Sequence, residues 1–237
     1  MVKILKWLGR ILIWFFMIQV VGALNALPML LGLEGVNYPT SMQWIQVFVY
    51  LILIFAVVFG ITRWVFRVDP TAPQQADFGR EEWKYLFKNW GILLISNLAF
   101  QFVRTLIGLN QPVENQQLIV DSVSALQDVG RPYLTATVIS LAFIGPVLEE
   151  FVFRGLGTRY VFKGWSPGIS AILVSMAFGA MHIPDFSSWA VLLDWIFYSW
   201  MGYLFHRAME RRNNIWDAVW LHMLNNAIAS LAILFLM

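Results

Sequence analysis

Seven long apolar stretches constrain the fold of this chain more than any other feature of its sequence. They cover residues 5–31, 42–66, 90–109, 133–162, 166–183, 188–206 and 215–236 of 237. A helix needs roughly 20 apolar residues to cross a hydrocarbon core of about 30 Å. The pattern predicts an all-α, polytopic membrane helix bundle with about seven transmembrane helices. We divide it into an N-terminal part, residues 1–132, and a C-terminal part, residues 133–237, of one integral membrane domain.

Composition narrows the function classes. With 59% hydrophobic and 13% charged residues, the chain is not a water-soluble globule. Its 16 basic residues are scattered between apolar stretches, so a surface that follows phosphates is excluded, and no nucleic-acid partner is expected. There is no cysteine, so any chemistry must use carboxylates, histidines, amides and hydroxyls.

The basic residues also predict an orientation. If the N-terminus is cytoplasmic, only Arg104 and Arg131 lie outside the inner segments and inner helix ends, which leaves 14 of 16 basic residues inside. By the positive-inside rule, we expect a multi-pass protein of the cell membrane with a cytoplasmic N-terminus and an external C-terminus. The first stretch is longer than the apolar region of a signal peptide, about 7–15 residues, and is interpreted as an anchor.

A polar segment separates the second and third stretches. Residues 69–73 favour a turn, and residues 78–88 place Trp83, Leu86 and Phe87 on one helical face with charges on the other. This pattern predicts an amphipathic helix lying on the inner leaflet, where we expect it to serve packing rather than substrate docking.

Ionisable residues interrupt the fourth stretch. Each such group at bilayer depth needs a partner, a water-filled cavity or a function. Glu149 and Glu150 point about 100° apart on a helix, and Glu150 can pair with Arg154 four residues later. Gly145 and Pro146 predict a kink that exposes carbonyls or admits water. We therefore interpret Glu150 and Arg154 as an ion pair and Glu149 as free for another role.

All three histidines lie in later stretches. His182 lies near the end of the fifth. His222 shares a helical face with Asn226 in the seventh, so the side chains of His222 and Asn226 can contact the same small group. The third, His206, is expected at an inner membrane interface.

Three motifs in these stretches resemble those of the CPBP intramembrane proteases, a family that includes CAAX prenyl endopeptidases and bacterial bacteriocin-processing or self-immunity proteins. Residues 149–154 fit E-E-x-x-x-R, residues 178–182 fit F-x-x-x-H, and residues 222–226 fit H-x-x-x-N, in the family's order. The resemblance covers roughly residues 133–237. It implies a hydrolase, an intramembrane endopeptidase that acts on a membrane-anchored protein or peptide.

The resemblance also implies roles for individual residues. Glu149, with His182, activates a water molecule. His222 and Asn226 stabilise the oxyanion. The supporting residues are Glu150, Arg154 and Phe178.

No metal or other cofactor is expected, because the H-E-x-x-H arrangement is absent. The alternative is Zn²⁺ bound by Glu149, His182 and His222, since two histidines and a carboxylate leave one open position.

If the seven stretches cross the membrane in alternating directions, the expected depths of the motif residues disagree with the motifs. It puts Glu149 and His222 in the inner half of the membrane and His182 near the outer end of its span, about 24 Å along it. The motifs require these residues to meet. We therefore expect either that the fourth span continues through Val161 or that residues 163–184 enter the membrane only partway.

The third stretch carries a polar stripe. Asn97, Gln101, Arg104 and Gly108 recur at helical spacing and cannot face lipid. One interpretation is packing between helices. The other is that Asn97, Gln101 and Arg104 line the cavity opposite Glu149 and that Arg104 holds the backbone or terminal carboxylate of a peptide.

Two other functions stay open at this stage. A non-catalytic immunity or sensor-regulating protein would use the same polar cavity to bind a partner. A proton-coupled transporter would also contain glutamate and histidine chains, although no internal repeat supports it.

Overall fold

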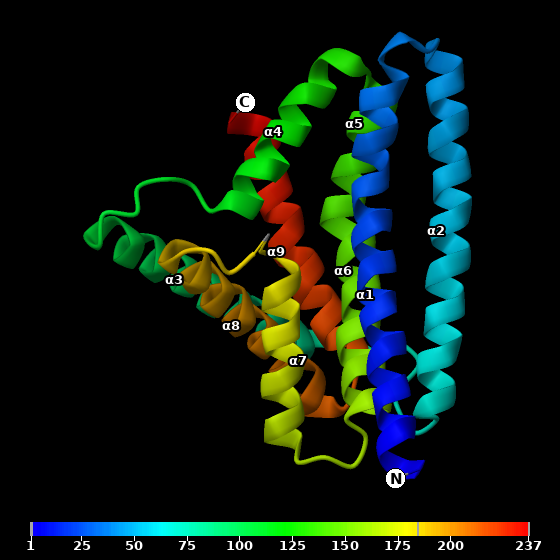
Figure 1. Ribbon diagram of the computed structural model, residues 1–237, viewed down its shortest axis with the longest axis vertical. Helices are drawn as coiled ribbons and strands as arrows, with labels where there is room; N and C mark the ends of the chain where they lie inside the picture. The colour runs from blue at the N-terminus through cyan, green and yellow to red at the C-terminus, as the bar shows by residue number, and fades with distance from the viewer. Residues whose placement is uncertain (1, 184, 237) are drawn as a thin grey trace.

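The computed structural model describes residues 2–183 and 185–236, and the described residues form helices without a strand (Figure 1). The elements in chain order are α1 (Val2–Glu34), the 3₁₀ turn η1 (Gly35–Asn37), α2 (Thr40–Val68), α3 (Arg80–Leu106), α4 (Glu114–Val129), α5 (Arg131–Ile139), η2 (Ser140–Ile144), α6 (Gly145–Glu150), η3 (Phe151–Val161), α7 (Pro167–Met181), α8 (Trp189–Arg212) and α9 (Ile215–Leu236). The predicted all-α polytopic membrane bundle is confirmed.

Five helical segments of the described chain are long and apolar enough to cross a membrane. They cover Lys3–Asn37, Thr40–Val68, Arg80–Leu106, Arg131–Val161 and Ile215–Leu234. Large apolar side chains stand exposed on the first three, among them Phe15, Phe55 and Leu98, as expected of helices that face lipid. Because α7 is short and α8 is more polar, the count of seven crossings remains a prediction.

The helices form two groups. Figure 1 shows α1, α2, the α5–α6 column, α7 and α9 running along the long axis, while α3 and α8 cross the bundle obliquely. α3 and α8 pack on each other through Phe100 and Phe197, whose rings stack at 4.3 Å, and through a hydrogen bond of 3.0 Å from Trp200 Nε1 to Ser96 Oγ. The two ends of the chain lie at opposite ends of the bundle.

The prediction of a separate amphipathic helix on the inner leaflet is wrong. Residues 80–106 form one helix, α3, which combines the amphipathic segment with most of the third apolar stretch. It begins where the N–H of Gly79 donates to the carboxylate of Glu82 at 3.0 Å, so the N-terminal end is capped and the helix continues without a break. The polar segment that follows also contains a helix, α4, which the apolar pattern did not predict.

The column from α5 to η3 is one continuous helical segment, Arg131–Val161, in which η2 and η3 are π-helical. The Gly145 N–H bonds to the carbonyl of Ser140 rather than that of Leu141. Pro146 has no N–H, so the Leu141 carbonyl loses its regular helical donor. The predicted opening of carbonyls beside Gly145 and Pro146 is therefore present.

This column explains how the motifs meet. The fourth span does continue through Val161, which places Glu149 well inside the column rather than near its end. In addition, α7 has only 15 residues and is about 22 Å long. Its C-terminal end therefore reaches Glu149 at depth instead of emerging on the far side.

Candidate active site

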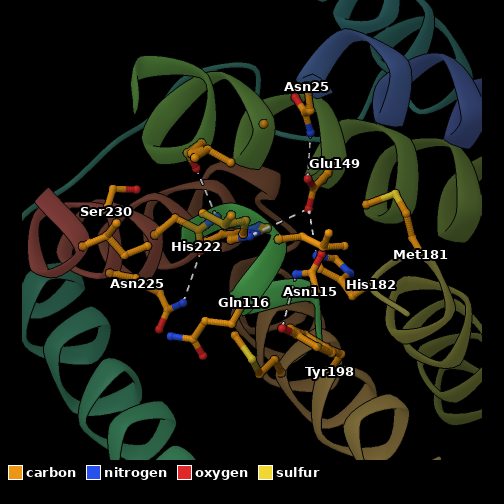
Figure 2. Close-up of a pocket in the computed structure, with 18 of the residues that line it drawn as sticks. Asn25, Asn115, Gln116, Glu149, Met181, His182, Tyr198, His222, Asn225 and Ser230 are labelled. Carbon is orange, nitrogen blue, oxygen red and sulfur yellow. Dashed lines mark hydrogen bonds and ion pairs between the residues drawn. The ribbon is translucent and has the colours of Figure 1, made fainter. Parts of the chain in front are cut away.

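A cavity of about 410 Å³ lies among α1, α3, α4, the α5–α6 column, α7, α8 and α9. Figure 2 shows Glu149 on its wall with His182 and His222 beside it. The volume falls in the range of about 300–1,000 Å³ that is typical of small-molecule binding sites. The three motifs thus line one cavity.

Glu149 presents one oxygen to this cavity. Its side chain is buried, and Oε1 accepts a hydrogen bond of 3.0 Å from Asn25 Nδ2 on α1. Gly145 permits this approach, because a Cβ there would lie 3.1 Å from Asn25 Nδ2. Oε2 has no hydrogen-bond partner and faces Nε2 of His182 at 3.8 Å and Nε2 of His222 at 3.9 Å.

Both histidines are held at Nδ1. His182 Nδ1 lies 2.8 Å from the carbonyl of Phe178, which can only accept, so Nδ1 is the donor. His222 Nδ1 lies 2.9 Å from Glu150 Oε1. In a neutral ring protonated at Nδ1, Nε2 carries the lone pair. The fixed contacts therefore turn both Nε2 atoms toward Glu149.

The predicted pair of Glu150 and Arg154 is present at 3.1 Å, and both side chains are fully buried. Arg154 also donates to the carbonyl of Gly202 and lies over the rings of Phe178 and Phe205, 4.7 and 5.6 Å from their centroids. Glu150 thus contacts both Arg154 and His222. The ion pair of Glu150 and Arg154 therefore fixes the His222 ring through Nδ1, on the side of the ring away from Glu149.

Asn226 contacts a different group from His222. Its Nδ2 donates to the Leu141 carbonyl at 3.2 Å, the carbonyl that the π-helical turn leaves without its regular donor. Its Oδ1 accepts from Asn225 Nδ2 at 3.2 Å. These two bonds fix the orientation of the Asn226 amide at the cavity wall.

The polar residues predicted to form a stripe on α3 do not all face the cavity. Asn97 lines the cavity, whereas Gln101 and Arg104 do not. The expectation that Arg104 faces the cavity is wrong: its buried side chain forms an ion pair with Asp194 on α8 and donates to the Gln111 carbonyl at 2.8 Å. A buried carboxylate is stabilised by a cation. The ion pair with Asp194 therefore explains why the third apolar stretch contains an arginine.

Several polar residues at the site escaped the sequence analysis. Asn25 had a signal, since it is an amide within an apolar stretch. Tyr198 had none: its ring stacks on His182 at 4.8 Å, and its hydroxyl accepts from Asn115 Nδ2 at 3.3 Å. His206, in the C-terminal part of α8, is 1% exposed, so its side chain packs against neighbouring helices, and its place at the inner membrane interface stays a prediction.

The alternative of a zinc site concerns Glu149, His182 and His222. Across residues 2–183 and 185–236, no group of three histidine, cysteine or carboxylate side chains is placed to hold an ion. Glu149, His182 and His222 have the donor types of a zinc site, and Oε2 of Glu149 faces the two Nε2 atoms at 3.8 and 3.9 Å, so the metal-free site and the zinc site both stay predictions.

Comparison with known proteins gives two matches. Residues 131–228, which contain all three motifs, match the family described as type II CAAX prenyl endopeptidase Rce1-like. A Bacillus subtilis (strain 168) protein named "Putative membrane peptidase YdiL" is 26% identical over 119 residues, which are 50% of this chain and 43% of that protein. The chain thus spans less than half the length of this relative. No solved structure gives a significant match.

Proposed function

We infer that this chain, whose residues 131–228 match the family model of the type II CAAX prenyl endopeptidases, is an intramembrane peptidase. It hydrolyses a peptide bond of a membrane-associated protein or peptide. One observation carries the inference beyond the family: Glu149 Oε2 is buried without a hydrogen-bond partner and faces two histidine nitrogens in a cavity between membrane helices.

The distances between Glu149 Oε2 and the two histidine Nε2 atoms leave room for a water molecule that Glu149 can activate. Separations of 3.8 and 3.9 Å are too long for direct hydrogen bonds, yet one water oxygen can lie about 2.8 Å from Glu149 Oε2 and from a histidine Nε2. Glu149 takes a proton from the water as its oxygen attacks the carbonyl carbon. The His182 lone pair accepts the second water hydrogen and so orients the attack. Glu149 then passes its proton to the leaving amine nitrogen.

The oxyanion requires donors on the other side of the carbonyl. Asn226 gives one amide hydrogen to Leu141, so its second hydrogen is available. His222 becomes a second donor in its imidazolium form, in which Nδ1–H donates to Glu150 and Nε2–H is directed into the cavity. Glu150 holds that ring in place through Nδ1, as a fixed donor requires.

We further propose that the N-terminal end of the bundle is cytoplasmic. Lys3, Lys6 and Arg10 lie near the start of α1, and Arg67 lies in the last turn of α2. This distribution follows the positive-inside rule and supports an external C-terminal end for α9.

The first test is cleavage itself, with a metal arm. Full-length protein in lipid nanodiscs is incubated with a library of membrane-anchored peptides, and products are identified by mass spectrometry. We expect cleavage that is unchanged by a chelator, because Glu149 and His182 act on water directly. Binding of peptides without any product would favour a non-catalytic partner protein instead. Loss of cleavage restored by Zn²⁺ alone would contradict the metal-free mechanism.

The oxyanion role of Asn226 gives a second prediction. Asn226→Ala should lower turnover about 10²–10³-fold with little change in KM, because one donor directed at transition-state charge has roughly that effect. Asn225→Ala should lower turnover less, since Asn225 acts on the oxyanion through the orientation of the Asn226 amide. Steady-state kinetics on one cleaved peptide separates the two parameters, and a rise in KM alone would assign Asn226 to substrate binding.

A further inference from the structure

His182 is less enclosed than the other histidine that faces Glu149. It is the first residue after α7, and its N–H donates to the Gly179 carbonyl at 3.0 Å as the helix ends. Its side chain is 17% exposed, whereas the side chain of His222, inside α9, is 2% exposed. A histidine ring has only a broad preference for rotation about its Cβ–Cγ bond. The neighbours of His182 must therefore set the direction of its Nε2.

One hydrogen bond and two aromatic rings contact the His182 side chain. The bond from Nδ1 to the Phe178 carbonyl fixes one edge of the ring but lets the ring rotate about that contact. The centroid of the Phe178 ring lies 4.5 Å away, and this ring is tilted by 38°. The Tyr198 ring lies 4.8 Å away and is inclined by only 21°, so it covers a face of the imidazole. Tyr198 thus limits the rotation that the hydrogen bond allows.

A similar arrangement at His222 uses a ring that packing alone can hold. Glu150 contacts Nδ1 of His222, and the Phe205 ring stacks on the imidazole at 4.4 Å and 17°. Phe205 is fully buried. Tyr198 differs, because it lines the cavity and is only partly buried. Since a ring at a cavity wall is packed on fewer sides, it needs a further contact to stay in place.

That further contact comes from α4. Asn115, the second residue of α4, donates from Nδ2 to the Tyr198 hydroxyl at 3.3 Å, as Figure 2 shows. The second half of α4 is anchored by Leu126, which is fully buried in an apolar cluster with residues of α2 and α5. Asn115 therefore connects a packed helix to the ring that covers His182.

We propose that Tyr198 is a positioning residue that directs Nε2 of His182 toward Glu149, and that Asn115 fixes Tyr198 in this role. The proposal rests on the proposed peptidase function, in which His182 orients the attacking water. A water held between Oε2 of Glu149 and Nε2 of His182 needs both atoms in place at once. Tyr198 and Asn115 take no proton in this role, so their loss lowers the rate without removing the base.

Removing the Tyr198 ring gives the kinetic test. Tyr198→Leu should lower kcat about 10–100-fold with little change in KM, because a misplacement of about 1 Å can lower a rate about 10²-fold. Tyr198→Phe keeps the ring without the hydroxyl and should lower kcat about 2–10-fold, the effect of one hydrogen bond. A rise in KM without a fall in kcat would assign Tyr198 to substrate binding and overturn the proposal.

The control is a second tyrosine on the same helix. Tyr203 stacks on Trp200 and lies outside the described cavity lining. The kcat of Tyr203→Leu should match the wild type. An equal loss of kcat in Tyr203→Leu and Tyr198→Leu would show a general effect on α8 and would overturn the proposal.

A double variant tests the connection to α4. Asn115→Ala should lower kcat by the same factor as Tyr198→Phe, because each change removes the same hydrogen bond. Combining the two changes should lower kcat no further. Additive losses would show that Asn115 acts apart from Tyr198 and would overturn the role given to Asn115.

Histidine NMR tests the orientation of His182 without any substrate. The chain has three histidines, and nitrogen spectra of full-length protein with isotope-labelled histidine rings distinguish their tautomers. The His182 signals are those that disappear in His182→Ala. We expect the Nδ1–H form of His182 in the wild type and a mixture with the Nε2–H form in Tyr198→Leu, because a ring that rotates loses its bond to Phe178.

An unchanged His182 tautomer in Tyr198→Leu would overturn the proposal. A change of the same size at His222 would also overturn it, because Phe205 and Glu150 hold that ring independently of Tyr198. If the wild-type protein gives the expected spectra but cleaves no peptide, the peptidase function fails while the positioning of His182 by Tyr198 stands.

Discussion

Replacing Glu149 with glutamine is expected to abolish peptide cleavage while the folded protein stays in the membrane. Glutamine keeps the size of the side chain, and its Oε1 can still accept the hydrogen bond from Asn25. The second carboxylate oxygen, which faces His182 and His222, becomes an amide nitrogen that cannot take a proton. A positioned general base contributes about 10²–10⁴-fold to the rate, so we expect a loss of that size in initial cleavage rate.

The control must change a glutamate without touching the site. Glu81→Gln alters an exposed carboxylate at the start of α3 that pairs with Lys84 at the protein surface, and the cleavage rate of this variant should match the wild type. Membrane levels and thermal unfolding of both variants show whether the fold is intact. More than a tenth of the wild-type rate in Glu149→Gln would rule out its role as the base.

Local features of the site followed from the sequence because helix geometry fixes them. A spacing of four residues brings Glu150 to Arg154 whatever surrounds the helix. Likewise, Pro146 removes a backbone donor wherever it stands, so the opening beside it was predictable. The motifs also indicated that Glu149, His182 and His222 meet, although the span alternation argued against it.

Long-range partners could not be predicted in this way. Periodicity identifies the polar face of a helix but not the helix that packs against it. Arg104 and Asp194 are 90 residues apart, and Asn25 and Glu149 are 124 apart. The sequence therefore allows two interpretations of the polar stripe on α3, and the position of Asp194 on α8 decides between them for Arg104. Similarly, apolar length predicts a crossing but does not show that α7 ends at the depth of Glu149 or that α3 begins ten residues earlier than its apolar stretch.

Replacing Arg154 with methionine is expected to destabilise the protein more than any other single change considered for this site. Methionine fills similar space but leaves Glu150, which is fully buried, without its cation, and leaves the Gly202 carbonyl without its side-chain donor. Breaking one side of a buried ion pair costs roughly 3–5 kcal/mol. We expect lower membrane levels and a lower unfolding temperature, measured for the purified protein in a single detergent.

Two comparisons distinguish the ion pair from other effects of this change. Arg207→Met removes an exposed cation from α8 that pairs with Glu210 and should cost no more than about 1 kcal/mol. Adding Glu150→Gln to Arg154→Met removes the unpaired charge and should restore part of the lost stability, because replacing both partners avoids a buried lone charge. The double variant should still cleave poorly, since His222 then faces an amide instead of a carboxylate. Wild-type stability in Arg154→Met together with a selective loss of turnover would instead place Arg154 among the groups that act on the substrate.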